Sequence, residues 1–217
     1  MSELVHKEQR ISEIKLFLES NQTWNEERRL LYQELRSLQR EASLLKKEET
    51  AIPIKNTFPQ DSGAPCPFVV SSGFNTGLLF YIGTSWKDWD ITAHDIHMLN
   101  NQSEDYIALV EFKGCYSYKF GGCNDEVLHG HPLYEHGLEA YDMHEIKNSK
   151  WIKEQEKINS VHPCFEQSEW NLRKHYIFTF HDDIFECIAD DYTVQIYQGG
   201  IKDVLKIANE NLFARYS

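Results

Sequence analysis

The 217-residue sequence predicts an α+β protein, in which a coiled-coil-like antiparallel helical hairpin precedes a mainly antiparallel β-sheet domain with flanking helices. Three observations lead to this prediction. Residues 3–49 contain neither glycine nor proline, residues 50–67 hold four of the six prolines, and residues 68–217 alternate short apolar runs with turn residues. The expected domains are therefore a helical assembly arm (1–49), a linker (50–67) and an acidic α+β domain (68–217).

Leucines in the second half of the helical segment follow a heptad pattern. The predicted seam consists of Leu31, Leu35, Leu38 and Leu45. Steps of four, three and seven residues are typical of a coiled coil. One such seam buries little surface. We therefore expect residues 3–49 to mediate homo- or hetero-oligomer formation, or else to pack on the rest of the same chain.

A break between two helices is expected near residues 20–23. Thr23 and Glu26 have the spacing of a capping box, so a second helix should begin there. A short connection between two amphipathic helices favours an antiparallel hairpin. The prolines that follow, in residues 50–67, disfavour helix and favour an extended linker.

The remaining chain reads as strands and helices joined by short turns. The expected strands are 68–70, 78–82, 106–112, 116–120, 176–180, 184–188 and 193–197, and the expected helical segments are 138–160 and 201–214. We expect 106–112 and 116–120 to pair as a hairpin, because only a short turn separates them. The three strands of 176–197 should form a meander, and Asn148-Ser149 should cap a second helix within 138–160.

Charge and cysteine content exclude several classes of protein. The formal net charge is −12, which argues against general nucleic-acid binding and against a polybasic membrane surface. Residues 1–50 contribute −1 (nine basic, ten acidic) and the remainder −11 (13 basic, 24 acidic), so the second part is expected to attract a basic protein partner. The five cysteines are an odd number and none of them forms a C-x-x-C pair, and the N-terminus is polar; both features favour a reducing cytoplasm. No apolar run is long enough to span a membrane.

Histidines are concentrated in one part of the chain. Seven of the ten lie between residues 129 and 181, with the densest group at His129, His131 and His136. An H-x-H pair on an extended segment points both rings to one side, and imidazole is a common ligand of zinc. These three histidines are therefore candidate ligands of a divalent metal such as zinc. Histidines that serve only local structure in loops are the alternative.

His181 and Asp182 are candidate catalytic residues. They lie in the expected turn between strands 176–180 and 184–188. An imidazole beside a carboxylate can act as a general base. The common nucleotide-binding and hydrolase motifs are absent, which leaves no reaction class indicated.

Two hypotheses for function remain. In the first, the chain is an intracellular interaction module or a subunit of a multi-protein system, for example an immunity- or antitoxin-type inhibitor. Its helical arm then mediates assembly and its acidic domain binds a partner. In the second, the chain is a metal-dependent or histidine-based enzyme of hydrolase type, with its site around residues 129–136 and His181.

Overall fold

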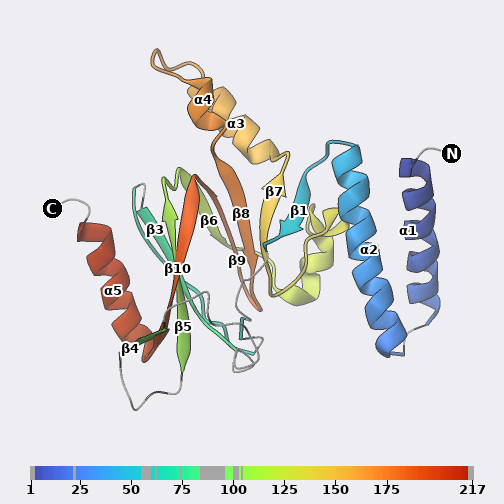
Figure 1. Cartoon of the computed structure of the whole chain (residues 1–217), viewed down its shortest axis with the longest axis horizontal. Coiled ribbons are helices and arrows are strands. Elements are labelled where there is room, and N and C mark those ends of the chain that lie inside the picture. Colours follow the sequence, from blue (N-terminus) through green and yellow to red (C-terminus); the bar gives the residue numbers. More distant parts are fainter. Residues whose placement is uncertain are drawn as a thin grey trace.

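The computed structural model describes residues 3–21, 23–54, 60–61, 63–73, 75–83, 96–99, 103 and 105–214. It confirms an α+β fold with two N-terminal helices, two mostly antiparallel sheets and further helices (Figure 1). Residues 55–59 and 62 of the expected linker lie outside the described residues. None of the described helices is long and apolar enough to cross a membrane.

The N-terminal helices α1 (Glu3–Ser20) and α2 (Glu26–Leu45) form an antiparallel hairpin. Ion pairs join the start of α1 to the end of α2, as between Lys7 and Glu41. Their shared apolar cluster has Ile14, Leu18 and Leu35 as its buried members. The hairpin thus buries its main apolar seam within itself.

The cap of α2 differs from the prediction. Asn25, not Thr23, is the N-cap residue, and its side chain accepts a hydrogen bond of 2.8 Å from the backbone N–H of Arg28. Asn is among the strongest N-cap residues. Because Asn25 lies one residue before Glu26, the helix begins two residues later than a Thr23 cap would place it.

The described residues include ten strands, which form two five-stranded sheets. The first has the order β1 (Thr50–Pro53), β7 (Met143–Lys147), β8 (Lys174–Thr179), β9 (Ile184–Ala189) and β6 (Ser117–Gly121). The second has the order β2 (Phe68–Ser72), β3 (Asn75–Tyr81), β5 (Tyr106–Lys113), β10 (Asp191–Gln198) and β4 (Ile96–Met98). Among these described strands, every pair is antiparallel except β4 with β10.

An aromatic core lies between the two sheets. Phe112 of β5 is 1% exposed, and its ring contacts those of Tyr176, Phe178 and Phe185 from the opposite sheet. Buried residues from both sheets belong to this single cluster. The two sheets therefore form a sandwich held by apolar burial.

Helices cover the outer faces of the sandwich. Helix α5 (Ile201–Ala214) packs Val204 and Ala208 on β3 and β5. The opposite sheet is covered by two short 3₁₀ helices, η3 (Asp125–Gly130) and η4 (Tyr134–His136), and beyond them by α2 (Figure 1). Helices α3 (Lys150–Asn159) and α4 (Gln167–Trp170) project from one end, and Ser149 caps α3 as predicted.

Two predicted strand pairings are wrong. β6 pairs with β9 rather than β5, and β10 pairs with β5 rather than β9. A strand has only two edges. β3 and β10 occupy both edges of β5, while β8 and β6 occupy both edges of β9. The chain therefore crosses between sheets after β5 and again after β9, which short turns alone do not reveal.

The predicted helix over residues 138–147 is also wrong. Residues 143–147 form strand β7, which pairs with β1 and β8. Tyr141 and Asn148 have φ of 58° and 57°, in the left-handed region that interrupts a helix. Strand β1 occupies the first four residues of the expected linker, so this part of the linker belongs to the sheet.

Candidate metal centre

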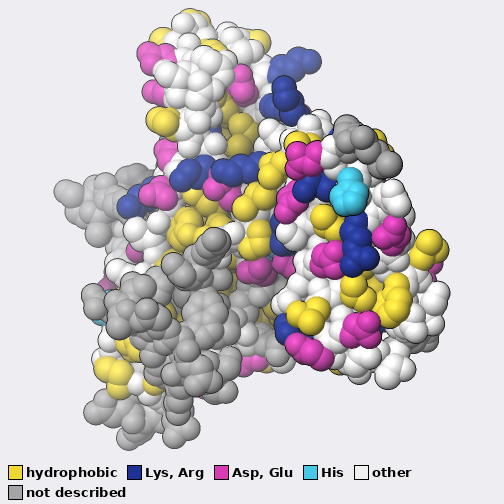
Figure 2. All heavy atoms as spheres, turned by 45° about the vertical axis from the view of Figure 1, so that its right-hand side comes forward, with side chains coloured by type: hydrophobic (Ala, Val, Ile, Leu, Met, Phe, Trp, Pro, Cys, Tyr) yellow, Lys and Arg dark blue, Asp and Glu magenta, His cyan; other side chains and the backbone are white. Residues whose placement is uncertain are grey.

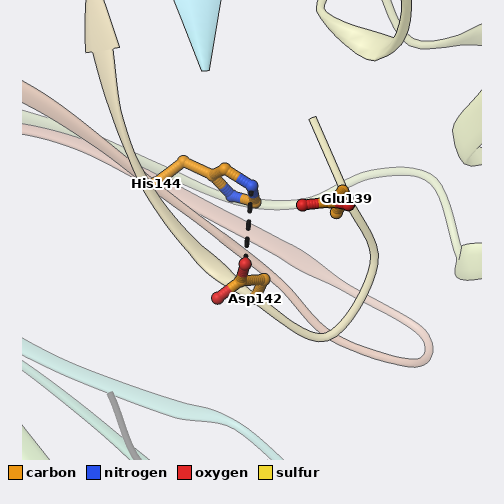
Figure 3. A group of neighbouring side chains, drawn as sticks. All are labelled: Glu139, Asp142 and His144. Carbon is orange, nitrogen blue, oxygen red and sulfur yellow. Dashed lines mark ion pairs between the residues drawn. The ribbon is translucent and has the colours of Figure 1, made fainter. Parts of the chain in front are cut away.

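Three side chains around the start of β7 have the composition and spacing of metal ligands. Glu139 and Asp142 come from the turn before β7, and His144 is the second residue of that strand. Each offers one ligand atom, and these atoms all lie within 4.8 Å of one another. Figure 3 shows the imidazole of His144 directed toward the carboxylate of Asp142, with Glu139 beside it. We call these three residues the metal centre.

The backbone of this turn is fixed by Thr179 of the neighbouring strand β8. The hydroxyl of Thr179 donates to the carbonyl oxygen of Glu139 at 2.7 Å and accepts from the backbone N–H of Asp142 at 3.2 Å. The left-handed conformation of Tyr141 turns the chain between the two carboxylates. The turn is therefore anchored to the sheet from which His144 projects.

His144 is the most unusual member of the metal centre. Its side chain is 0% exposed, and neither ring nitrogen has a hydrogen-bond partner among the described residues. Burial lowers its pKa to about 3, with smaller effects from the positive charges of Arg40 and Arg36. The ring is therefore neutral at pH 7, with a lone pair on one nitrogen. Its Nε2 lies 3.8 Å from Oδ2 of Asp142.

The two carboxylates have different environments. Burial, assisted by the negative charge of Glu139, raises the pKa of Asp142 to about 6. A hydrogen bond from the backbone N–H of Met143 opposes this shift. Glu139 forms an ion pair with Arg40 of α2. With a pKa of about 6, Asp142 is mainly ionised at pH 7 and can serve as an anionic ligand.

One imidazole and two carboxylates suit a divalent transition metal. Zinc, manganese and ferrous iron accept both nitrogen and oxygen ligands, whereas calcium and magnesium favour oxygen alone. Three protein ligands also leave a coordination position for water or a substrate. These three side chains could therefore hold a metal ion and leave one coordination position open.

The structure does not bring His129, His131 and His136 together as three ligands of one metal. A ring nitrogen of His129 lies 3.1 Å from the carbonyl oxygen of Glu126, and His131 accepts from the backbone N–H of Leu133. Nδ1 of His136 lies 2.8 Å from Oγ of Ser43 in α2. This contact joins the helical hairpin (α1 and α2) to the part of the chain from β1 onward, which we call the body. Among the described residues, no three-ligand group other than the metal centre has metal-ligand spacing.

His181 lies at the tip of the β8–β9 hairpin, as predicted, but its nearest carboxylate comes from elsewhere. Its Nδ1 is 3.2 Å from Oδ2 of Asp125 and 2.9 Å from the hydroxyl of Tyr141. Asp182 is farther, with Oδ1 4.0 Å from Nε2 of His181. Tyr141 donates to Asp125, and burial together with this bond raises the pKa of Tyr141 to about 12. An imidazole oriented by a carboxylate at Nδ1 has its other nitrogen available for proton transfer.

The predicted assembly seam lies largely inside the helical hairpin. Leu35 is buried against α1, and Leu31 and Leu38 pack partly buried on the same cluster. Leu45 is 49% exposed at the end of α2.

The sequence patterns did not predict Glu139, Asp142 and His144 as a site, although these residues are close in the chain. Glu139, Asp142 and His144 are spaced at i, i+3 and i+5. On the predicted helix the two carboxylates would share a face and the histidine would not. The strand that begins at Met143 is what turns the imidazole toward them. Asp125 and Tyr141 carried no local signal at all, because they lie 56 and 40 residues from His181.

No protein family model, no curated protein and no solved structure matches this chain.

Proposed function

We propose that this chain binds one divalent transition-metal ion through Glu139, Asp142 and His144. One observation carries the proposal: His144 is completely buried beside two carboxylates, and within the described part of the chain both its ring nitrogens lack a hydrogen-bond partner. A buried polar group left unsatisfied costs about 1–3 kcal/mol. Such groups in a native protein call for a specific explanation, of which a bound ion is one.

A metal ion would resolve both unfavourable features of the site. It would accept the lone pair of the neutral His144 ring, and its charge would offset the two carboxylates that burial brings close together. Ligand atoms around zinc lie about 2.0–2.2 Å from the ion. The side chains of Glu139 and Asp142 are only partly buried, so they can rotate to close the remaining distance.

The test is a binding titration of the chain after removal of metals with a chelator. Isothermal titration with Zn²⁺ and Mn²⁺ should give one saturable site, and Ca²⁺ should bind far more weakly. Asp142→Asn and His144→Gln should each weaken binding at least tenfold. His129→Ala is the matched control, because His129 lies outside the metal centre, and it should bind as the native chain does.

Two results would contradict the proposal. One is the absence of saturable Zn²⁺ or Mn²⁺ binding by the folded native chain. The other is loss of binding in His129→Ala with full binding in His144→Gln, which would place the site on the loop at residues 129–136.

A second proposed function is that of a cytoplasmic interaction module. It is supported by large apolar side chains exposed on the projecting part around α3 and α4, namely Ile158, Val161 and Leu172, at 63%, 86% and 69% exposure. Grouped exposed apolar residues are typical of contact surfaces. Sedimentation equilibrium should show concentration-dependent association that the Ile158→Ser, Val161→Ser, Leu172→Ser triple variant loses. An identical monomeric state of both chains at every concentration would exclude self-assembly through this surface.

A further inference from the structure

The helical hairpin contacts the metal centre through Arg40. The guanidinium of this α2 residue forms an ion pair with Glu139, and it also donates to the carbonyl oxygens of Gly137, at 2.8 Å, and Ala51, at 3.1 Å. Glu139 is thus shared between the metal centre and the hairpin.

The other contacts between the hairpin and the body are also mainly polar. Arg36 donates to the carbonyl oxygen of Tyr134 at 2.6 Å and lies over its ring, while Gln39 donates to Glu135 at 2.9 Å. The apolar cluster of the hairpin is separate from the cluster beneath η3 and η4. Figure 2 shows charges of both signs mixed with isolated hydrophobic side chains on the hairpin.

Open space remains along this contact. A cavity of about 610 Å³ lies between the hairpin and η4, and its walls include Tyr32, Leu35 and Tyr134. A second, of about 350 Å³, has Gln39, Ser43 and His136 among its lining residues. A contact that rests on hydrogen bonds and ion pairs, with little apolar burial, can open without loss of the sandwich core.

We propose that a metal ion bound at the metal centre competes with Arg40 for Glu139, so that metal binding loosens the helical hairpin from the body. This inference rests on the proposed metal binding and assigns its regulation. The ion and the guanidinium are both cations, and each requires the carboxylate of Glu139. Their mutual repulsion disfavours simultaneous occupancy in a site partly shielded from water.

The positive charge of Arg40 reaches the other two ligands as well. Burial raises the pKa of Asp142, and the charge of Arg40 offsets part of that rise; for His144, Arg40 is the largest cause of the lowered pKa after burial. An ion placed among these ligands would experience the same charge. By linkage, if metal weakens the docking of the hairpin, then weaker docking must strengthen metal binding by the same factor.

The first experiment compares metal affinity in arginine variants of α2. Arg40→Gln should bind Zn²⁺ or Mn²⁺ at least tenfold more tightly than the native chain, because the competing cation is gone. Arg29→Gln is the matched control: Arg29 belongs to the same helix but pairs with Glu26, one turn away in that helix, so affinity should not change. An unchanged or lower affinity in a folded Arg40→Gln variant would overturn the inference.

The second experiment needs no variant. Amide hydrogen exchange is followed in the native chain with and without saturating Zn²⁺, comparing residues 131–138, which contact the hairpin, with β5 in the opposite sheet. Metal should speed exchange at least severalfold in 131–138 and leave β5 unchanged. Binding with unchanged or slower exchange in 131–138 would overturn the coupling while metal binding itself stands. No binding to either the native chain or Arg40→Gln would instead overturn the proposed metal function.

Discussion

Replacement of His144 by leucine should make the metal-free chain more stable and abolish its metal binding. The native ring is 0% exposed, and neither of its nitrogens has a hydrogen-bond partner in the described residues. Removing an unsatisfied buried polar group recovers about 1–3 kcal/mol. Leucine has a similar volume and adds no polar atom, so the free energy of unfolding at pH 7 in the presence of chelator should rise by about that amount.

The difference between the two chains should grow in acid. The pKa of His144 is lowered to about 3 in the folded chain, against about 6.5 when unfolded. A base with a depressed folded pKa contributes stability that is present above pH 6.5 and is lost as the pH falls toward 3. At 1.36 kcal/mol per pKa unit, the native chain should lose about 3 kcal/mol relative to the leucine variant between pH 7 and pH 4.

The assay is urea denaturation followed by circular dichroism at pH 7 and pH 4, with chelator present. His129→Leu serves as the matched control, because His129 is exposed and should change stability by no more than about 0.5 kcal/mol. A His144→Leu variant that is less stable at pH 7, with no wider gap at pH 4, would refute the reasoning. It would mean that the ring nitrogens have partners in solution, such as a buried water, and the argument for a metal ligand would be lost.

Other substitutions test the fold around the metal centre. Phe112→Ala should lower the free energy of unfolding by about 3–5 kcal/mol, measured in urea, because this ring is 1% exposed between the sheets. Ser149→Ala should cost about 1 kcal/mol or more, because it removes the cap of α3 and the 2.9 Å partner of buried His175, and a cost below about 0.3 kcal/mol would contradict the cap. Gly137→Ala should lower the melting temperature and speed hydrogen exchange in residues 131–138, since φ is +94° and the new Cβ would lie 2.3 Å from Cγ of Arg40. A Gly137→Ala variant as stable as the native chain would show that the hairpin does not rest closely on this residue.

Local patterns predicted those parts of the fold that depend on nearby residues. The absence of glycine and proline with regular leucine spacing predicted the helical hairpin, and residues 201–214 form α5 within the predicted bounds. The β8–β9 hairpin formed around His181 because its strands are adjacent and its turn is short. In each case the pattern belongs to one element, or to two elements that are adjacent in the sequence and joined by a short connection.

Patterns of similar strength failed where partners are distant. Residues 143–147 were predicted as helix because their apolar positions fit more than one period. They form a strand in the structure because they pair with β1 and β8. β6 was expected to pair with β5, but β3 and β10 pair with the two edges of β5. Histidine density indicated residues 129–136. His144 and His175 are the buried histidines among the described residues, and of these two only His175 has hydrogen-bond partners there.

The sequence by itself determined the α+β class, the helical hairpin, the capped helix α3 and the terminal helix, because periodicity, capping and turn residues act over short distances. Only the tertiary structure decided which strands pair, and that the hairpin lies against its own body. It alone set Glu139, Asp142 and His144 around one point and placed Asp125 beside His181. Those outcomes depend on burial and on contacts between remote segments, which a local sequence pattern does not contain.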